Sequence, residues 1–322
     1  MDDWLIIKQI LWTSVATSTP LVLFSMAFAL VLKVVRLFNF AQAGIMSAGF
    51  YAAYSPIEYF ELPLWAGIAG GILGALTVTY LLEIFGFRVL RMKKSSVFTF
   101  FIFSLVFSEF VSYVAMLVFG TWPKTVLPTI FWPAEIIGGV AVSSWDVPAL
   151  GTALGLVVAL NLVFYFTRQG QFMTAVADNP DLAELYGINK ERVFMTTMLI
   201  AGLLVVAGMV LYGTRSQVHP ATTLDLMVFA VAATILGGIG NVTGAAVAAV
   251  ALSIIQSMSI LVIPSHWQGF LLYGFLFFAI IFMPNGFRLP KKLKVDTGTR
   301  NLKPEDGFES GDKQDSSKVA ES

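Results

Sequence analysis

Few residues in this chain are of the types that carry out chemistry, and they are scattered. The sequence has no cysteine, which excludes disulfide frameworks, thiolate zinc sites, iron–sulfur clusters and cysteine nucleophiles. Its two histidines, His219 and His266, are far apart and lack nearby carboxylates that could complete a metal or catalytic site. No serine is paired with a recognisable base. We therefore expect neither an enzyme nor a metal site, and no cofactor in this chain.

One acidic residue stands out because of its position. Glu109 lies near the middle of the apolar segment 95–119, among Ser104, Ser108 and Ser112. An ionisable side chain at that depth of a membrane-spanning segment is a functional candidate by default. Two interpretations stay open: Glu109 belongs to a polar pathway, or its carboxyl group only locks the packing of helices.

Two amides form a second candidate group, at the start of another apolar segment. Asn39 and Gln42 are three positions apart and share one face of a helix, with Phe40 between them and Gly44 following. Burying an amide without a partner is costly, so we expect both to face protein or a polar path.

A glycine cluster, 236–244, is the third candidate, and it contains Gly237, Gly238, Gly240 and Asn241. A glycine-rich loop binds phosphate when it follows a strand and precedes Lys-Ser/Thr, and neither is present here. We expect instead a break between two helices or a small-residue packing surface. Further glycine pairs have the spacing of close helix contacts: Gly67/Gly71, Gly70/Gly74 and Gly151/Gly155.

The segment 178–188 reads as a short helix with both ends marked. Asn179 can cap it, Pro180 suits its first position, and Gly187 suits the left-handed residue that ends a helix. Its apolar side chains fall on one face at helical spacing, and a helix this short needs to be docked on something. On spacing alone, a groove on a partner and the helix ends of the same chain are equally good candidates.

These residues are embedded in a composition that requires a membrane. The chain has 322 residues, of which 57% are apolar and 12% charged, and its mean hydropathy is +0.79. Soluble domains have about 45–50% apolar and about 25% charged residues. A water-soluble enzyme or a nucleic-acid binder is thereby excluded. We expect an all-α transmembrane helix bundle of about 8–10 helices, some of them short or broken.

Nine apolar segments are the candidate crossings, and the first is read as an uncleaved segment, not a signal peptide. They cover 11–35, 40–54, 63–87, 95–119, 148–167, 192–213, 226–240, 244–263 and 268–284. The short segments 40–54 and 226–240 are rich in Gly, Ala and polar residues, so broken or re-entrant helices are possible there. We divide the chain into a membrane domain, 1–290, and a disordered charged tail, 291–322.

The net charge of zero hides an asymmetry that orients the chain. Basic loops favour the cytoplasmic side, and the loop 88–94 is the most basic of the short loops. Counting crossings from this loop places the C-terminus in the cytoplasm, the N-terminus outside, and the tryptophan-containing loop 120–147 on the outer surface. Nine basic residues then lie on the cytoplasmic side: Lys33, Arg36, Arg88, Arg91, Lys93, Lys94, Arg168, Lys190 and Arg192. Three lie outside: Lys8, Lys124 and Arg215.

Taken in order, these motifs resemble those of the permease subunits of branched-chain amino acid ABC importers. The family pattern Asn-Phe-Ala-His-Gly is similar to the stretch 39–43, and Leu-Gly-Gly-x-Gly-x-x-x-Gly is matched at 236–244. The stretch 181–187 resembles the Glu-Ala-Ala…Gly coupling motif, and 283–286 resembles the Arg-Pro-x-Gly ending. The resemblance covers roughly 11–290.

This resemblance implies a multi-pass permease in the bacterial inner membrane that does not itself hydrolyse ATP. It implies a second permease subunit, identical or paralogous, two cytoplasmic ATPase subunits and an extracytoplasmic solute-binding protein, with no nucleic acid. The short helix would dock on the ATPase through Asp181, Leu182, Ala183, Leu185, Tyr186 and Gly187. The substrate pathway would involve Asn39, Phe40, Gln42, Gly44, Glu109, Gly237, Gly238, Gly240 and Asn241.

Several positions depart from the family pattern. Gln42 stands where the family has His, Ala43 where it has Gly, Phe50 where a small residue is usual, and Met283 where it has Arg. Glu109 stands where a neutral amide is expected. Branched-chain amino acids are the leading substrate, and urea or short amides are the alternative. An ion-coupled transporter that uses Glu109 and a non-transporting scaffold are the rival functions.

Overall fold

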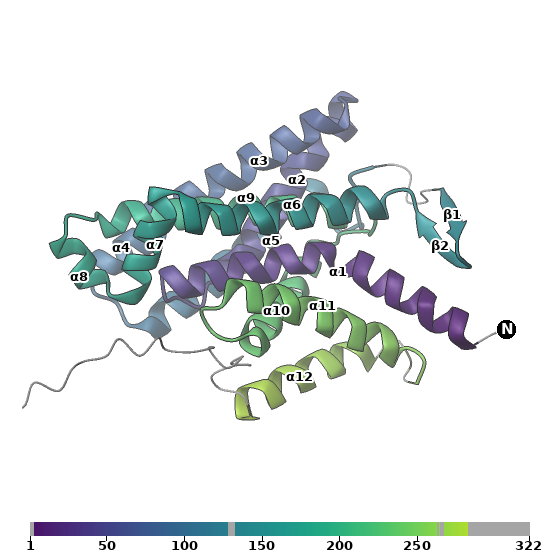
Figure 1. Ribbon diagram of the computed structural model, residues 1–322. Coiled ribbons are helices and arrows are strands. Elements are labelled where there is room, and N and C mark those ends of the chain that lie inside the picture. The colour runs from purple at the N-terminus through teal and green to yellow at the C-terminus, as the bar shows by residue number, and fades with distance from the viewer. Residues whose placement is uncertain (1–2, 128–132, 263, 265–266, 283–322) are drawn as a thin grey trace, which may run out of the picture. The chain divides into compact units, whose positions relative to one another are not determined.

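The computed structural model describes residues 3–127, 133–262, 264 and 267–282, all within the compact unit Met1–Arg288 (Figure 1). The predicted all-helical class is confirmed. The helices are α1 (Asp3–Val34), α2 (Ala41–Phe60), α3 (Leu64–Leu81), η1 (Leu82–Phe87), α4 (Arg88–Met92), α5 (Val97–Phe119), α6 (Asp146–Phe166), α7 (Arg168–Asp178), α8 (Pro180–Leu185), α9 (Lys190–Gly213), α10 (Thr222–Gly237), α11 (Val242–Ser259) and α12 (Gln268–Phe282). The predicted tail, 291–322, and Met283 lie outside the described residues.

Each of the nine predicted apolar segments contains a helix in the part that the structure describes. Among the described residues, six helices are long and apolar enough to cross a membrane: Trp4–Val34, Leu64–Met92, Val97–Phe119, Asp146–Phe166, Lys190–Gly213 and Val242–Ser259. Apart from these six, α10 and α12 are shorter, and α2 is rich in small and polar residues. The two short segments for which a broken or re-entrant helix was one possibility form the continuous helices α2 and α10. Protein surrounds most of both, which removes the need for a uniformly apolar surface.

Two sets of four helices pack in the same pattern: the first set is α1, α2, α3 and α5, and the second is α9, α10, α11 and α12. Each set packs against the first helix of the other. In the first set α2 packs against α3 and α5; in the second set α10 packs against α11 and α12. The leading helix α1 crosses over to pack against α10 and α11, while α9 crosses over to pack against α2 and α3. The helices α1 and α9 also pack against each other, as do α2 and α10. This arrangement is that of a repeat whose two halves are interlocked.

The central helix α1 contains a proline, and a nearby hydroxyl group bonds to the carbonyl group that this proline leaves free. Pro20 has no N–H group, so the carbonyl of Ala16 loses its usual helical partner. The hydroxyl group of Thr19 donates to that carbonyl at 2.7 Å. From α10, the hydroxyl group of Thr234 donates to the carbonyl of Ser25 at 3.1 Å. These two hydroxyl groups therefore bond to backbone carbonyl groups of α1, and lipid could not supply such hydrogen bonds.

The glycine pairs of α3 confirm the predicted close helix contact, and the pair of α6 does not. A Cβ atom on Gly67 would lie 2.4 Å from Ile57, and one on Gly74 would lie 2.4 Å from Ala52, both on α2. Around Gly151 and Gly155 nothing lies within 4 Å of such an atom in the described part of the chain. The spacing of two glycines does not reveal which way their helix faces, so this prediction failed for α6.

The basic residues gather at one end of the bundle. Nη2 of Arg36, which follows α1, donates to the backbone carbonyls of Ala177 and Asp178 at 2.6 and 3.0 Å. Arg91 of α4 is ion-paired with Glu83 of η1 and, at 2.7 Å, with Glu191 at the start of α9. Figure 1 shows α4, α7 and α8 together at this end, which we call the basic end. Since α1 finishes there and α9 begins there, the two halves run in opposite directions.

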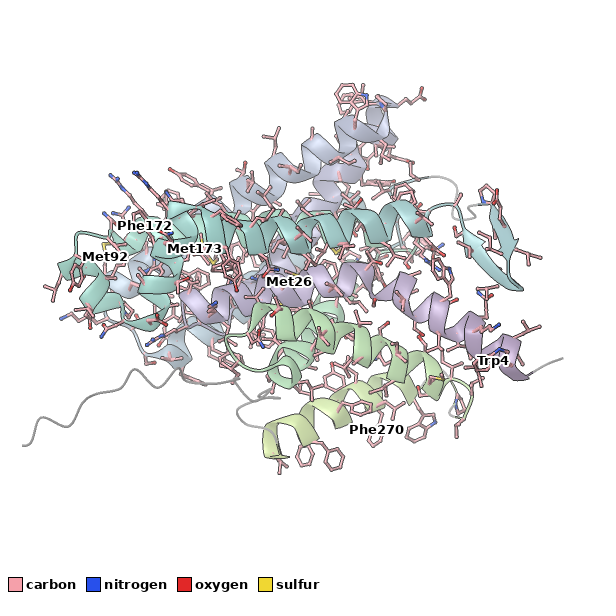
Figure 2. All side chains as sticks on the ribbon, in the orientation of Figure 1. Trp4, Met26, Met92, Phe172, Met173 and Phe270 are labelled. Carbon is pink, nitrogen blue, oxygen red and sulfur yellow. The ribbon has the colours of Figure 1, made fainter. Side chains whose placement is uncertain are left out.

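The opposite end carries a hairpin that the sequence analysis treated as a loop. Strands β1 (Ala134–Ile137) and β2 (Val140–Ser143) pair antiparallel across Gly138 and Gly139, both of which have positive φ, as a tight two-residue turn requires. Gln9 of α1 bonds both ways with the backbone of Ala141, at 2.7 and 3.1 Å. In Figure 2, Trp4 marks this end, and Met92 and Phe172 mark the basic end.

A buried carboxylate holds this hairpin end together. Asp146 is 2% exposed and accepts bonds from the indole N–H of Trp12 at 3.1 Å and from the backbone N–H of Ser143 at 3.2 Å. Its other oxygen is ion-paired with Arg215 at 2.5 Å. A single side chain thus joins α1, β2, α6 and the segment after α9.

Replacing Asp146 with alanine should destabilise the bundle, because it removes three charge-assisted bonds and leaves Arg215 without its counter-ion. We expect a loss of about 2 kcal/mol, or roughly 5 °C in the thermal midpoint measured in detergent. The matched control is Asp225→Ala, an exposed carboxylate at the start of α10, which should leave the midpoint within about 1 °C. Equal midpoints for both variants would contradict this account of the hairpin end.

Candidate functional site

The two predicted amides lie where α2 enters the core, and both are 1% exposed. The side-chain oxygen of Asn39 accepts from the backbone N–H of Ala41 at 3.1 Å, and its nitrogen lies 3.7 Å from the sulfur of Met198 on α9. The side-chain nitrogen of Gln42 donates to the carbonyl of Ala27 on α1 at 3.2 Å. Both amides therefore face protein, as expected, and they connect α2 to the two exchanged helices.

Several polar atoms on and beside α2 are buried without a hydrogen-bond partner in the described part of the chain. These atoms are Oε1 of Gln42, Oγ of Ser47, Oη of Tyr51 and Oγ of Ser108. An unpaired buried polar atom costs about 1–3 kcal/mol, so four such atoms on two packed helices call for an explanation. Water or a polar solute would satisfy these atoms.

The other predicted pathway residues on α2 hold α5 in place. The backbone N–H of Phe40 donates to the hydroxyl group of Ser104 at 3.1 Å, and its ring packs edge-on against Phe101 at 5.4 Å between centroids. A Cβ atom on Gly44 would lie 3.2 Å from the Cα atom of Ser108, so the two backbones are close. Phe40 and Gly44 thus determine how α2 and α5 cross.

Glu109 does not share this buried environment. Its neighbours Ser104 and Ser108 are buried against α2, whereas Glu109 lies on the exposed side of α5. The structure therefore separates it from Asn39 and Gln42 within one chain. Sequence position alone gave its depth along the helix, and the direction in which it faces depends on how α5 packs.

The glycine cluster forms the turn between α10 and α11 at the basic end. Gly238 and Gly240 have φ values of 97° and 85°, which favour glycine. A Cβ atom on Gly237 would lie 2.3 Å from the backbone of Gly244. Asn241 caps α11, because its side-chain oxygen accepts from the backbone N–H of Gly244 at 3.0 Å. The segment is the predicted break between two helices.

This turn borders a cavity at the basic end. The cavity has a volume of about 650 Å³ and is lined by residues of α1, α6 and α7 as well as by Gly240 and Asn241. The ammonium group of Lys33 lies in its wall, 4.7 Å from the centre of the Phe164 ring, and Asp178 lies on the same wall. Two residues predicted for the substrate pathway therefore line an open space, but one that is separate from the amides of α2.

The predicted short helix is present as α8, with the expected ends. The side-chain oxygen of Asn179 accepts from the backbone N–H groups of Asp181 and Leu182 at 3.2 and 3.1 Å, Pro180 occupies the first turn, and Gly187 has a φ of 82°. Local residue types determine each of these features, which explains why the sequence predicted them.

The apolar face of α8 is not covered by the described residues of its own chain. Leu182, Leu185 and Tyr186 are 50%, 85% and 81% exposed, while Ala183 is buried at 4%. Of the two alternatives that the spacing left open, packing of these three side chains against the helix ends that the structure describes is therefore excluded. A surface of this kind at the end of a bundle fits a partner protein.

Contacts at the basic end connect α8 to the core. The ammonium group of Lys190 is ion-paired with Glu184 of α8 at 2.7 Å, which joins α8 to the start of α9. Arg36 binds the end of α7 and lies three residues before Asn39. These contacts join α8 to the start of α9, and the end of α7 to the segment that leads into α2.

Two features escaped the sequence analysis. The first is a cavity of about 490 Å³ at the hairpin end, lined by Thr17, Pro20, Arg215, Asp225 and Ser253 among others; the hydroxyl residues around Pro20 were its only signal. The second is the buried Glu83, 1% exposed, in the π-helical segment η1. Glu83 is ion-paired with Arg91, which is also ion-paired with Glu191. Because Glu191 is distant in sequence, no local pattern predicts this network.

Among the residues that the structure describes, no group of three His, Asp or Glu side chains could hold a metal ion. The side chain of His219 bonds to the backbone: its Nδ1 accepts a hydrogen bond from the N–H group of Ala221 at 3.2 Å. His266 lies outside the described residues, as do Pro284 and Gly286 of the predicted family ending.

Comparison with known proteins agrees with this picture. Residues 10–280 match the family model described as "Branched-chain amino acid transport system / permease component". The LivH permease protein of a high-affinity branched-chain amino acid transport system from Salmonella typhimurium is 23% identical over 88% of this chain and 96% of its own length. The corresponding protein BraD from Pseudomonas aeruginosa is 24% identical over 82% of this chain and 90% of its own length.

Two further similarities complete the comparison. The nucleoside ABC transporter permease protein NupB from Lactococcus lactis is 25% identical over 75% of this chain and 70% of its own length. Among solved structures, PsaBC from Streptococcus pneumoniae in complex with a Fab has a TM-score of 0.47 at 11% identity, over 86% of this chain and 91% of that chain. Since the family model spans most of the sequence and the fold has six membrane-length helices, the chain is a multi-pass membrane protein that belongs to the branched-chain amino acid transport system permease family.

Proposed function

We propose that this chain is the membrane-spanning subunit of an ATP-driven importer for branched-chain or closely related amino acids. The observation that carries the proposal is the exposed apolar face of α8 at the basic end, in a chain of this permease family. A permease subunit that leaves ATP binding to a partner needs a surface through which that ATPase can move it. A scaffold that does not transport needs no such moving contact.

The choice of solute rests on the relatives. LivH and BraD are named for branched-chain amino acids, whereas NupB is named for nucleosides, so the family carries more than one class. The former two align with a larger share of this chain, and amino acids are accordingly our first choice. Urea or short amides remain the alternative, because Gln42 replaces a residue type usual at the start of α2.

In this proposal α8 docks in a groove of a cytoplasmic ATPase subunit. Leu185 and Tyr186 fill the groove, and the rigid ends set by Asn179 and Gly187 let the helix move as one body. Closure of two ATPase subunits on ATP pushes α8, and the Lys190–Glu184 and Arg36 contacts pass the movement to α9 and α2. ATP is bound by the ATPase, and this chain needs no cofactor.

The proposed pathway passes the unpaired polar atoms of α2. Gln42 bonds to the exchanged helix α1, and a relative movement of the halves would open or close access to its free oxygen. Inverted halves that rock about a central site are the usual design of alternating access. An extracytoplasmic solute-binding protein delivers the solute at the hairpin end, and a second permease subunit completes the pathway.

The protein would reside in the bacterial inner membrane with the basic end in the cytoplasm. The asymmetry of the basic residues supports this orientation, because it places Arg36, Arg91 and α8 on one side and the hairpin on the other. The C-terminus is then cytoplasmic, since α12 is the ninth crossing.

Placing a charge on the docking face should uncouple transport. Leu185→Asp should reduce uptake of radiolabelled leucine in cells at least tenfold, because a carboxylate cannot enter an apolar groove without a large desolvation cost. Gly187→Glu should act similarly, since its φ of 82° strains any larger residue. Leu185→Met is the control, because it keeps an apolar side chain at the same exposed position. Normal uptake by Leu185→Asp, at wild-type levels in the membrane, would refute the coupling assignment.

Removing the free oxygen on α2 should impair transport without unfolding the protein. Gln42→Met loses one hydrogen bond to Ala27, worth about 1 kcal/mol, but also removes a buried unpaired oxygen of similar cost. We expect an unchanged thermal midpoint and uptake reduced about tenfold or more. Thr197→Val, which removes a buried hydroxyl group bonded within α9, should leave uptake intact. A Gln42→Met protein that transports normally would place the pathway elsewhere.

A further inference from the structure

The cavity of about 490 Å³ at the hairpin end holds a cation and a carboxylate in its wall. Arg215 comes from the segment after α9, and Asp225 comes from the first turn of α10. Cavities of this size commonly bind small solutes. We call it the hairpin-end cavity, and the coupling proposed for α8 at the opposite end gives it no role.

Arg215 is held in place and still has nitrogen atoms to offer. Its Nη1 atom is ion-paired with the buried Asp146 at 2.5 Å, which fixes the guanidinium group beside the start of α6. Within the described part of the chain, Nε and Nη2 of Arg215 have no hydrogen-bond partner. Because a guanidinium group donates several hydrogen bonds in one plane, a second carboxylate can bind to the nitrogens that Asp146 leaves free.

Asp225 is a carboxylate without a cation. It is exposed, and among the described residues its side chain has neither an ion pair nor a hydrogen bond. Its place in the first turn of α10 suits a negative charge, since the helix dipole is positive there. Solvation accounts for such a residue on an open surface. In the wall of a cavity that also holds Arg215, the carboxylate can in addition receive a cationic group of a solute.

The rest of the hairpin-end cavity divides into a polar mouth and an apolar floor. The two charged residues are among its more exposed lining residues and therefore lie near its opening. The half-buried Gln256, whose side chain has no hydrogen-bond partner in the part of the chain described, adds a donor and an acceptor to the wall. Apolar residues that are at most 8% exposed form the floor: Leu211, Leu226, Phe229 and Leu272.

An α-amino acid with an apolar side chain carries the matching groups. Its carboxylate and its ammonium group are attached to the same carbon atom, and its side chain extends away from both. Urea and short amides have no charge to pair with Arg215 or Asp225, and a simple carboxylate or amine pairs with one of them alone. The two charges together therefore favour an amino acid over these other solutes.

We propose that the hairpin-end cavity binds an α-amino acid with an apolar side chain. Its carboxylate binds Arg215, its ammonium group binds Asp225, and its side chain packs on Leu226 and Phe229. This site deepens the proposed function: it rests on amino acids being the solute, and it names the residues that recognise them at the end where they are delivered. Residues of α1 and of α9 to α12 line the cavity, so a movement of one half against the other changes its shape.

Protection of a cysteine from labelling tests the site on the full-length chain, which has no natural cysteine. Ser257 of α11 is half-buried and lines the cavity, whereas Ser259 is half-buried on the same helix and does not line it. Purified Ser257→Cys and Ser259→Cys proteins in detergent are treated with a fluorescent maleimide, with and without saturating L-leucine. We expect leucine to slow labelling of Ser257→Cys about tenfold or more by mass action, and to leave labelling of Ser259→Cys unchanged.

Analogues that lack one group at a time test each contact. Isocaproate has no ammonium group, isoamylamine has no carboxylate, and glycine has no side chain. Each should need a concentration about tenfold or more above that of leucine for half protection, because it gives up a charge-assisted pair or the burial of apolar surface. Urea and acetamide should not protect. Without any label, leucine should raise the thermal midpoint of the natural chain more than isocaproate does.

Two variants in the Ser257→Cys background test the charged residues. Asp225→Asn should weaken leucine protection about tenfold or more and leave protection by isocaproate undiminished, because isocaproate has no ammonium group to lose a partner. Arg215→Lys keeps a cation for Asp146 but has no second nitrogen for the solute, so it should weaken protection by both. Loss of structure at Asp225 would weaken both ligands, and so the change in selectivity separates recognition from a structural role.

Four results would overturn the site. They are equal labelling of Ser257→Cys with and without leucine together with an unchanged midpoint, equal protection of Ser259→Cys, isocaproate or isoamylamine that protects as well as leucine, and leucine protection that survives Asp225→Asn. Each leaves the proposed function standing, because leucine can still pass along α2. Selective protection by leucine, in a protein whose ATP-driven leucine uptake with its ATPase fails, would count against the proposed function and leave the site standing.

Discussion

The exchange of α1 and α9 between the two halves is the constraint on which the rest of the structure depends. Each half needs the leading helix of the other to cover its inner face, so neither can form its core alone. This arrangement buries α1 from about Ser14 onward and holds α2 and α10 beside each other at the centre. A central helix surrounded by protein can carry polar groups that a lipid-facing helix cannot.

That tolerance explains why the chemistry of this chain is concentrated on α2. Gln42 and Asn39 bond to helices of both halves, so their environment changes if the halves move. Since the halves run in opposite directions, the turn at Gly237–Gly244 and the segment containing Arg36 come to the same end as α8. The fold thus brings the exposed apolar face of α8, the ion-pair network of Arg91 and the start of α2 to the same end of the bundle.

Local patterns in the sequence predicted the local features well. The caps of α8, the glycine turn before α11 and the close contact of Gly67 and Gly74 follow from residue types at fixed spacings. The direction that a helix face takes was not predictable, and so Glu109 and the pair at Gly151 and Gly155 face outward against expectation. Ion pairs between residues distant in sequence were also missed. Examples are the pair of Asp146 with Arg215 and the pair of Glu191 with Arg91, which also binds Glu83. These depend on the interlocking of the halves, which no single segment encodes.

The central claim is that ATP hydrolysis in a partner drives this chain. Reconstitution in proteoliposomes tests it most directly, with the permease, its cognate ATPase and its solute-binding protein purified and combined. The account predicts that leucine accumulates when ATP is supplied on the ATPase side, and that an imposed proton or sodium gradient without ATP gives no accumulation. Gradient-driven accumulation by the chain alone, without the ATPase, would contradict it and would favour an ion-coupled transporter that uses Glu109.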